Sequence, residues 1–258
     1  MKISAVIITK NEERNIERCL KSLQNIVDEI VVVDSFSTDA TKEICEQYHV
    51  KFFQKEWLGY AEQKNQANSL SANEIILSID ADEALSPELQ QSLLQFKLTD
   101  KQNVVCQINR LTNYCGKWIH HCGWYPDKKI RVFNRNAAKW TGNIHETLSY
   151  SSGNAVIRLN GDLLHYSYYS IEEHILQANK YSTLAAEACF EKNKKYSVFV
   201  LLLKSAWRFV RDYFFKGGFL DGFYGFVICS INAMTTLLKY VKLKQLHKGK
   251  NSNQQISK

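Results

Sequence analysis

The sequence contains little proline and little glycine, with 2 Pro and 11 Gly among 258 residues. Such a composition excludes a collagen-like chain and argues against a Pro-rich linker or extended disorder. Hydrophobic residues make up 45% of the chain, which is enough to build a core. A chain of this length can form one large domain, with or without an appendage.

Long uncharged apolar runs are also lacking. A secretory signal requires an apolar stretch of roughly 7–15 residues, whereas the N-terminal run covers only residues 3–8. A membrane span requires about 20 apolar residues. The nearest candidate, Phe219–Leu238, contains Asp221 and Asn232. We therefore expect neither a signal peptide nor a membrane-spanning segment.

The seven cysteines are scattered and odd in number, which favours reduced thiols in a cytoplasm. Cys115 and Cys122 enclose His120 and His121, a combination that invites comparison with zinc sites. Their spacing matches no common structural zinc pattern, and no second pair follows. The sequence therefore does not predict a zinc site.

Charge is distributed unevenly along the chain. Residues 1–191 contain 20 Lys/Arg and 24 Asp/Glu, whereas residues 192–258 contain 13 Lys/Arg and only 2 Asp/Glu. A mildly acidic body therefore carries a strongly basic end, which suggests an anionic partner for that end.

The first hundred residues alternate between strand and helix patterns. The predicted strands cover residues 3–8, 29–34, 51–57 and 74–80, and the predicted helices cover residues 13–23, 38–48, 60–70 and a segment from Ser86. This βαβαβαβ order predicts an α/β fold with a mostly parallel central sheet, covered by helices on both faces.

The pattern changes after residue 103. Short strands are predicted over residues 104–111, 129–134, 155–159 and 163–168, with aromatic-rich loops between them. Residues 171–245 read as helices. We expect a catalytic domain over residues 1–170, comprising halves 1–100 and 101–170. A helical basic extension over 171–245 and a disordered tail over 246–258 would follow.

Three loops at the carboxyl ends of the predicted parallel strands, residues 9–13, 34–39 and 80–83, are candidate ligand sites. Ligands of open parallel sheets bind at this edge. The loop after the first strand, TKNEE, has no glycine, so it cannot cradle phosphates with its backbone. In LSIDADE, Asp80 and Asp82 follow the fourth strand and point to the same side.

Two adjacent carboxylates repel each other unless a cation lies between them, and oxygen ligands suit Mg²⁺ or Mn²⁺. The alternative is an acidic entry to the next helix, but Ser86-Pro87-Glu88 gives that helix a cap of its own. Asp34 ends the second strand, where an acid commonly reads a ribose hydroxyl. Its alternative is a plain loop residue.

Several ordered motifs resemble family-2 glycosyltransferases with the GT-A fold. In the first half they are ITKNEERNIERCLKSL, DEIVVVDSFSTDAT, QKN and LSIDADE. In the second half WIHHCGWYPDKKIRVFNR, IHE, LLHYSY and GGFLDGFYGF resemble lipopolysaccharide core β-1,4-glucosyltransferases. The resemblance covers about residues 1–245 and implies a usually inverting enzyme.

The resemblance also implies roles for individual residues. The uridine would be contacted by four of them: Thr9, Asn11, Glu12 and Asp34. Lys64 would lie near the diphosphate, and Asp80 and Asp82 would hold the metal. Glu146 would stand where these enzymes place the catalytic carboxylate. His165 would approach the metal, although a lone histidine beside tyrosines is also commonly packed and hydrogen-bonded.

Sugar transfer requires a base that removes the acceptor hydroxyl's proton. Glu146 is the first choice and Asp127, in a polar aromatic loop, is the rival. The alternative for each is a solvated surface carboxylate. Trp118 and Trp124 flank the expected acceptor cleft and are candidates for sugar contacts, with packing as their alternative.

The basic C-terminal third intersperses Arg208, Arg211 and Lys216 with aromatic residues. This composition suits an interfacial helix on an anionic membrane, whereas its alternative is a set of solvated helix faces. We therefore expect a cytoplasmic enzyme bound peripherally to the inner face of the cytoplasmic membrane.

Together these features predict a metal-dependent hexosyltransferase. It would transfer a hexose, expected to be glucose, from a UDP-sugar to a lipid-linked or lipopolysaccharide-core glycan, with no nucleic-acid partner. A sugar-nucleotide nucleotidyltransferase is the first competing hypothesis, but such enzymes usually have a glycine-rich loop where this chain has TKNEE. A non-catalytic membrane or nucleic-acid binder is the second, and the strand-end carboxylates argue against it.

Overall fold

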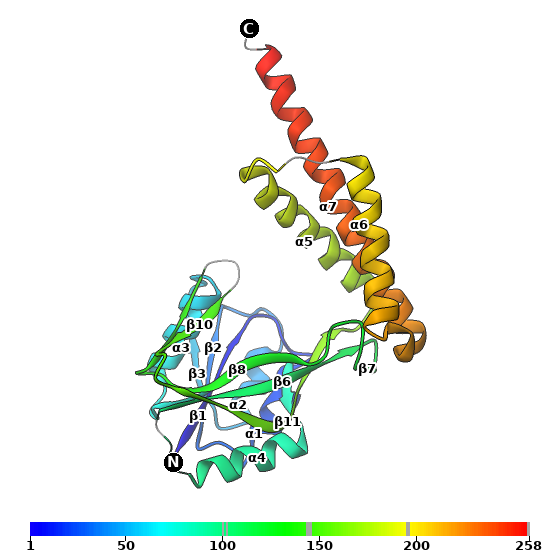
Figure 1. Ribbon diagram of the computed structural model, residues 1–258. Helices are drawn as coiled ribbons and strands as arrows, with labels where there is room; N and C mark the ends of the chain where they lie inside the picture. Colours follow the sequence, from blue (N-terminus) through cyan, green and yellow to red (C-terminus); the bar gives the residue numbers. More distant parts are fainter. Residues whose placement is uncertain (100, 102, 143–145, 195–196, 257–258) are drawn as a thin grey trace. The chain divides into compact units, whose positions relative to one another are not determined.

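A computed structural model describes residues 1–99, 101, 103–142, 146–194 and 197–256 (Figure 1). The chain forms two compact units. The first comprises Met1–Leu111 and Pro126–Tyr166, and the second comprises Thr112–Tyr125 and Ser167–Lys258. The sequence placed the boundary near residue 170 and did not anticipate that residues 112–125 belong with the C-terminal helices.

The strands of the chain are β1 (Ile3–Thr9), β2 (Glu29–Asp34), β3 (Lys51–Gln54), β4 (Ile75–Asp80), β5 (Glu83–Leu85), β6 (Val104–Tyr114), β7 (Lys117–Ile119), β8 (Asp127–Asn134), β9 (Ala138–Thr141), β10 (Thr147–Tyr150) and β11 (Ala155–Tyr168). The sequence did not predict β5, β7, β9 and β10, which have only three or four residues each. Such short elements carry too few residues for a periodic pattern.

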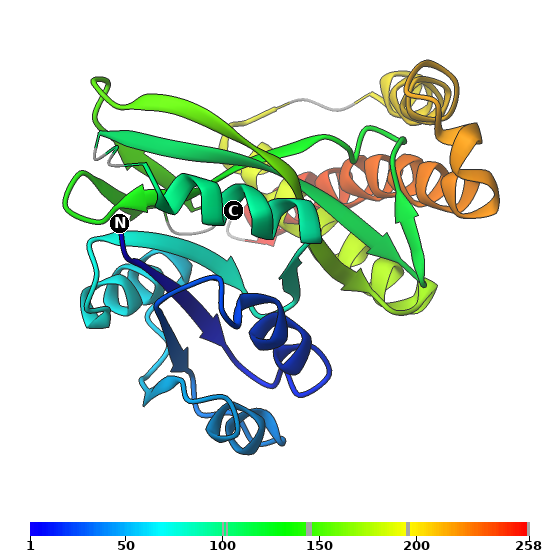
Figure 2. The ribbon, with the colours of Figure 1, turned by 90° about the horizontal axis from the view of Figure 1, so that it is seen from below.

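The main sheet has nine strands in the order β3-β2-β1-β4-β8-β6-β11-β5, with β7 paired to β6. β3, β2, β1 and β4 are parallel, and β4 pairs with β8 in the antiparallel sense. Figures 1 and 2 show β1, β2 and β3 side by side. The sheet is therefore mixed, and its parallel part is built from the βα repeats that the sequence predicted.

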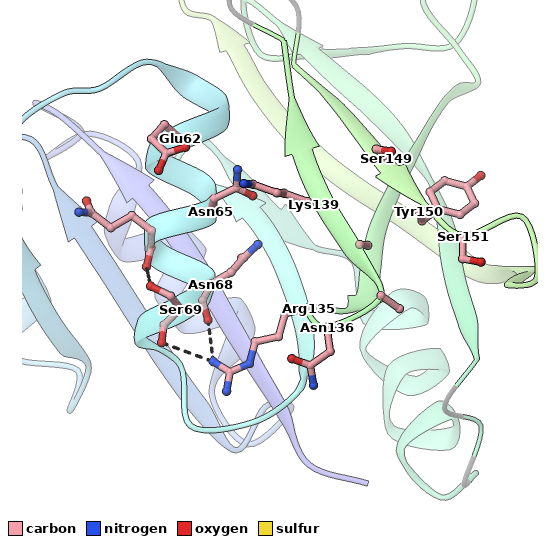
Figure 3. Close-up of a pocket in the computed structure, with 13 residues that line it drawn as sticks. Glu62, Asn65, Asn68, Ser69, Arg135, Asn136, Lys139, Ser149, Tyr150 and Ser151 are labelled. Carbon is pink, nitrogen blue, oxygen red and sulfur yellow. Dashed lines mark hydrogen bonds between the residues drawn. The ribbon is translucent and has the colours of Figure 1, made fainter.

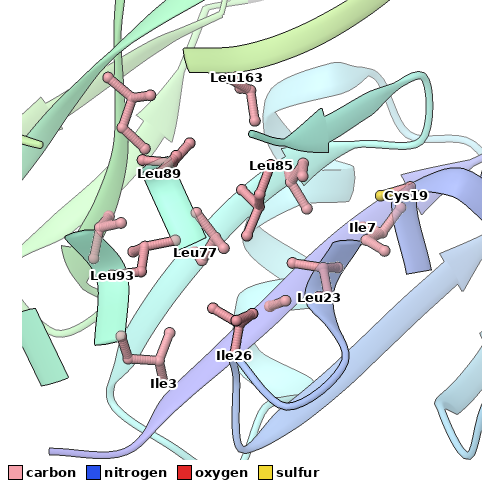
Figure 4. Packing of buried hydrophobic residues seen from close by; sticks show 14 of the residues in the cluster. Ile3, Ile7, Cys19, Leu23, Ile26, Leu77, Leu85, Leu89, Leu93 and Leu163 are labelled. Atoms are coloured by element: carbon pink, nitrogen blue, oxygen red, sulfur yellow. The ribbon is translucent and has the colours of Figure 1, made fainter. Parts of the chain in front are cut away.

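Helices cover both faces of the parallel strands. In the first unit they are α1 (Ile16–Leu23), α2 (Thr41–Glu46), α3 (Tyr60–Leu70) and α4 (Pro87–Lys97). Alternate residues of β1 face opposite cores, because strand side chains have a period of two. Ile3 and Ile7 join a cluster with α1 and α4 (Figure 4), whereas Val6 joins a second cluster with Ala67 of α3 and Trp140 of β9.

A close backbone contact joins β11 to the first turn of α4. Ser86 caps α4 by accepting from Leu89 N–H at 3.2 Å, and its hydroxyl oxygen also accepts from Asp162 N–H at 3.1 Å. Gly161 has φ of +87° and lies against the backbone of residues 88 and 89. The sequence predicted two strands here, but the glycine lets one continuous strand bend over the helix end.

The second unit is largely helical. Its helices are α5 (Ile171–Glu191), α6 (Val198–Val210), the π-helical η1 (Arg211–Phe215), the 3₁₀-helical η2 (Gly218–Asp221) and α7 (Gly222–Ile256). Tyr114, Ile119 and Ile228 are buried in its core. His174 is buried beside the Tyr114 hydroxyl at 3.0 Å, and burial lowers its pKa to about 4.

The C-terminal helix differs from the sequence prediction in two ways. α7 continues to Ile256, whereas a disordered tail was predicted from residue 246, and residues 257–258 lie outside the described part. Among the described helices, the stretch Gly218–Lys248 is long and apolar enough to cross a membrane, judged by length and composition alone. The prediction that no stretch could span a membrane is therefore not confirmed.

Replacing Gly161 with alanine should destabilise the first unit strongly. A Cβ atom at this position would lie 2.2 Å from the Leu89 backbone nitrogen, which a flexible side chain cannot relieve. Gly59→Ala is a matched control, because Gly59 has φ of +97° but no atom within 4 Å of its added Cβ. We expect the Gly161 variant to lose about 1–3 kcal/mol more than the control in urea unfolding. Equal losses would contradict the contact.

Candidate active site

Hydrogen bonds join the loops that follow β1 and β2. Asn11, with φ of 55°, donates its N–H to Ser37 Oγ at 2.8 Å and accepts from Thr38 N–H at 2.8 Å. Glu12 N–H donates to Thr41 Oγ1 at 2.8 Å. The two loops therefore form one hydrogen-bonded rim at the carboxyl edge of the sheet.

All four predicted uridine contacts, Asn11 included, lie in or beside this rim. Asp34 is fully buried and accepts from Ser37 N–H at 2.9 Å. Thr9 is also buried, and its Oγ1 has no hydrogen-bond partner among the described residues. Burial raises the pKa of Glu12, against the effect of its hydrogen bond with Asn15. The rim thus combines a fixed acid with an unused buried hydroxyl.

At the end of β4, Asp80 is held by two cations. Its Oδ1 lies 3.0 Å from Lys64 Nζ, and its Oδ2 accepts from Arg131 at 2.7 Å. Burial alone would raise its pKa, but the charges of Arg131 and Lys64 outweigh burial and hold the pKa well below its usual range. Asp80 is therefore ionised and already neutralised by protein groups.

Glu83 fixes the turn that carries both aspartates. It is 1% exposed, accepts from Asp80 N–H at 3.0 Å, and accepts from Arg131 at 2.6 Å. Arg110 lies 3.6 Å from the same carboxylate. Burial raises the pKa of Glu83 despite the opposing charge of Arg131. From the sequence, Glu83 could equally have been a solvent-exposed residue, whereas the structure buries it.

Asp82 and His165 converge at the same edge. Asp82 Oδ2 lies 3.1 Å from His165 Nε2. The backbone maintains this pairing, because β11 pairs with β5 through His165 and Glu83, and Tyr166 N–H donates to the Asp82 carbonyl at 2.9 Å. His165 Nδ1 is buried without a hydrogen-bond partner in the described part of the chain.

The predicted metal ligands therefore do not form one set. Among the described residues no group of three His, Cys, Asp or Glu side chains is arranged to hold a metal ion. Asp80 faces Lys64 and Arg131, so only Asp82 and His165 converge. The 3.1 Å between Asp82 Oδ2 and His165 Nε2 is a hydrogen-bond distance, and these two side chains are the ones that could hold a cation with further ligands from a substrate.

Lys64 connects the two sides of the site. Its ammonium lies 3.1 Å from Glu146 Oε1 as well as 3.0 Å from Asp80, and 4.8 Å from the centre of the Trp140 ring. Glu146 immediately precedes β10, while the Ile144 and His145 of the IHE motif lie outside the described residues. The structure thus brings the predicted diphosphate lysine and the predicted base together.

Asp127, the rival base, has a different environment. Arg110 donates to its Oδ2 through two nitrogens, at 2.9 and 2.7 Å, and Lys129 lies 3.2 Å from its Oδ1. Burial raises its pKa, but the charges of Arg110 and Lys129 dominate and lower the pKa. A carboxylate bound in this way is a weak proton acceptor.

The two predicted acceptor tryptophans belong to the second unit. Trp124 packs among aromatic rings, with ring centroids 5.8 Å from Tyr114 and 5.7 Å from Tyr168. Trp118 lies in β7 and is partly exposed. The packing of Trp124 therefore agrees with the alternative considered in the sequence analysis, in which this ring packs against other side chains instead of contacting a sugar.

Arg131 and Glu83 were not among the predicted site residues. Arg131 is 4% exposed within β8, between apolar neighbours in the sequence IRVF. A charged residue inside an apolar strand indicates a buried ion pair, because such a residue is rarely buried without a partner of opposite charge. The identity of that partner depends on the pairing of β8 with β4, which has no local signature because Asp80 lies 51 residues before Arg131 in the sequence.

Comparisons with known proteins identify relatives of this chain. The family model described as glycosyl transferase family 2 matches residues 4–125. An uncharacterized glycosyltransferase of Rickettsia typhi is 37% identical over 95% of this chain and 87% of its own length. The lipopolysaccharide core biosynthesis glycosyltransferase LpsC of Rhizobium meliloti is 30% identical over 95% and 93%, respectively. Among solved structures, S. aureus TarS 1–349 in complex with UDP-GlcNAc aligns with 69% of this chain and 66% of its own, at a TM-score of 0.44 and 19% identity.

The protein is a glycosyltransferase with an α/β GT-A fold. It belongs to glycosyl transferase family 2: the model of that family matches residues 4–125, and the Rickettsia and Rhizobium glycosyltransferases are related to it over 95% of the chain. The resemblance of the sequence motifs to this family is thereby confirmed.

Arg131→Met should destabilise the first unit by about 3–5 kcal/mol at pH 8, because it leaves buried carboxylates without their cation. The pKa of Glu83 is already raised by burial, and loss of Arg131 should raise it further. A folded-state pKa above the unfolded value makes folding more favourable as pH falls, so the loss should shrink at pH 5. Urea unfolding at both pH values measures this.

Lys128→Met is the control, because Lys128 lies on the same strand but is exposed. It should change the free energy of unfolding by less than about 0.5 kcal/mol at either pH. If Arg131→Met lowers the free energy of unfolding by the same amount at pH 5 and pH 8, the effect of the substitution comes from packing and not from charge.

Proposed function

We propose that this enzyme transfers a hexose, with glucose as the first candidate, from a UDP-sugar to a lipopolysaccharide-core or other surface glycan, with inversion. The observation that carries the proposal is the convergence of Lys64 on Asp80 and Glu146, with Asp82 of the turn after β4 paired with His165 of β11. The name of the Rhizobium relative, which specifies lipopolysaccharide core biosynthesis, supports the choice of acceptor.

The rim formed by the first two loops would bind the uridine. Asp34 would accept hydrogen bonds from ribose hydroxyls, as acids at this position commonly do. The buried Thr9 Oγ1 lacks a partner among the described residues, and a nucleotide would supply one. Asn11 and Glu12 would shape the rim through their bonds to the second loop.

Asp82 and His165 would hold a divalent cation, together with oxygens of the diphosphate. Mg²⁺ is usually bound by one or two carboxylates plus substrate phosphates, and carboxylate oxygens suit Mn²⁺ as well. A cation bound there stabilises the charge that grows on the UDP leaving group. Asp80, neutralised by Lys64 and Arg131, would orient Lys64 toward the diphosphate and would not itself need to contact the metal.

Glu146 would act as the base. Its carboxylate would take the proton of the acceptor hydroxyl while that oxygen forms the new bond to the anomeric carbon and the bond to UDP breaks. Inversion requires this attack from the face opposite UDP. Asp127 is the weaker candidate, because Arg110 and Lys129 already engage both of its oxygens.

Substitutions should separate binding from turnover. Glu146→Gln should retain Mn²⁺-dependent UDP binding, measured by calorimetry, and lose about 10²–10⁴-fold in turnover. Asp82→Ala should abolish transfer and weaken UDP binding in Mn²⁺, with no further weakening when EDTA is added. Asp127→Asn tests the rival base. Full activity of Glu146→Gln together with an inactive Asp127→Asn would reverse the assignment.

The second unit carries an exposed apolar surface suited to a membrane. We call it the aromatic surface, and its members are Phe199, Leu202, Leu203, Trp207, Phe214, Phe215, Phe219, Leu220 and Phe223, each at least 50% exposed. Three cations, Arg208, Arg211 and Lys216, surround the buried Asp212 and leave an excess of positive charge. We propose that this surface attaches the enzyme peripherally to the inner, anionic face of the cytoplasmic membrane.

Vesicle binding tests the attachment. Wild-type protein should bind phosphatidylglycerol-rich vesicles at low salt and should be released at high salt, because surface charge is screened. Phe214→Ser with Phe215→Ser should weaken partitioning at least about tenfold. Leu98→Ser, which alters an 89% exposed leucine in the first unit, is the control. No binding at low salt, or membrane retention through alkaline carbonate, would contradict peripheral attachment.

A further inference from the structure

A polar groove lies in the first unit between α3 and the β9–β10 hairpin (Figure 3). Its volume is about 980 Å³. One wall is formed by Asn65, Gln66 and Asn68 of α3, and the other by residues of the hairpin, including Ser149 and Tyr150. Neither the predicted uridine contacts nor the predicted metal ligands line it.

The helix face toward this groove is unusual in composition. Glu62, Asn65, Gln66 and Ser69 follow the spacing i, i+3, i+4, i+7 and all line the groove. A helix that packs on a hairpin normally places apolar residues at this spacing. This polar face leaves the groove open. Three of its four side chains carry an amide or a hydroxyl group, and one is charged.

Two residues that line the groove have a buried amide oxygen without a hydrogen-bond partner among the described residues. The two atoms are Asn68 Oδ1 and Gln66 Oε1, and Asn68 is only 5% exposed. An unsatisfied buried polar atom costs about 1–3 kcal/mol, so each is expected to have a partner in the working protein. A ligand hydroxyl can donate or accept, so it satisfies either orientation of these amides.

The groove walls are fixed independently of any ligand. Asn65 exchanges two hydrogen bonds with the Trp140 backbone, both at 2.9 Å, which ties α3 to β9. Arg135 donates to the carbonyls of Asn68 and Ser71 at 2.9 and 2.7 Å and so satisfies the C-terminal end of α3. A preformed polar groove binds at a smaller entropic cost than a flexible one.

The hairpin links the groove to the proposed base along the sequence, although Glu146 itself does not line the groove. Glu146 immediately precedes β10, and Ser149 and Tyr150 at the far end of β10 line the groove. Four strand residues span about 13 Å, so Tyr150 lies well away from Glu146 along the strand. The lining has few charged residues. Arg135 donates hydrogen bonds to the C-terminal end of α3, and the negative charge of Glu62 balances the positive charge of Lys139.

We propose that this groove binds the uncharged, hydroxyl-rich part of the acceptor glycan, namely the sugar residues that precede the one receiving the hexose. The amides of Gln66 and Asn68 accept or donate hydrogen bonds to sugar hydroxyls, and the partly exposed Tyr150 ring contacts a sugar face. The inference rests on the proposed function, because it takes Glu146 as the point where the acceptor hydroxyl reacts.

Two substitutions test the groove without touching the donor site. Gln66→Leu removes an amide on a helix, and Ser149→Val places methyl groups on a strand that tolerates them. Gln91→Leu, on the exposed face of α4, is the matched control. The long acceptor is core oligosaccharide released by mild acid from the lipopolysaccharide of a strain lacking this enzyme. The short acceptor is the methyl glycoside of its terminal sugar.

Both groove variants should raise KM for the long acceptor about tenfold or more, while kcat, KM for the short acceptor and UDP affinity stay at the wild-type values. Gln91→Leu should change none of these. If the wild type transfers sugar but neither variant changes KM for the long acceptor, the groove proposal is overturned and the proposed function stands.

If the wild type transfers nothing to either acceptor, the proposed acceptor class fails, and direct binding of the long oligosaccharide decides the groove separately. NMR titration of the wild type against Gln66→Leu provides this measurement. Binding lost in the variant supports the groove as a glycan site, and equal or absent binding overturns it.

Discussion

The arrangement of the site depends on one buried ionic interaction, between Arg131 of β8 and the carboxylates of Asp80 and Glu83. β8 pairs antiparallel with β4, so the guanidinium lies beside the point where β4 ends. Glu83 then accepts from the Asp80 N–H and closes the turn between them. Burying this many charges is costly unless they are paired, so the turn has little freedom to adopt another conformation.

This constraint makes the two aspartates of the DAD sequence different. Asp80 forms ion pairs with Lys64 and Arg131. Burial would raise the pKa of Asp80, but the charges of these two cations outweigh burial and hold the pKa low. Asp82 contacts His165 instead. The pairing of β11 with β5 places His165 beside Asp82. A pattern that looks symmetrical in the sequence thus becomes one structural carboxylate, which positions a lysine, and one carboxylate available to a cation.

The local features of the fold could be predicted from sequence, and the long-range pairings could not. The strands and helices of the first hundred residues have clear periodicity, and the Ser86 cap and the acidic strand end are local signals. β5, β9 and β10 have three or four residues and are defined by their partners. For the same reason, the sequence shows Arg131 as a charged residue within an apolar strand, but its ion pair with Asp80 could be predicted only from the β4–β8 register.

Helix α3 shows why a single element can serve both the donor and the acceptor. Consecutive residues of a helix project about 100° apart, so Lys64 turns to Asp80 and Glu146 while Asn65 turns to the hairpin. Asn65 holds the Trp140 backbone, and the Trp140 ring covers the Lys64 ammonium. The contact that fixes one wall of the groove therefore also positions the cation between the two carboxylates.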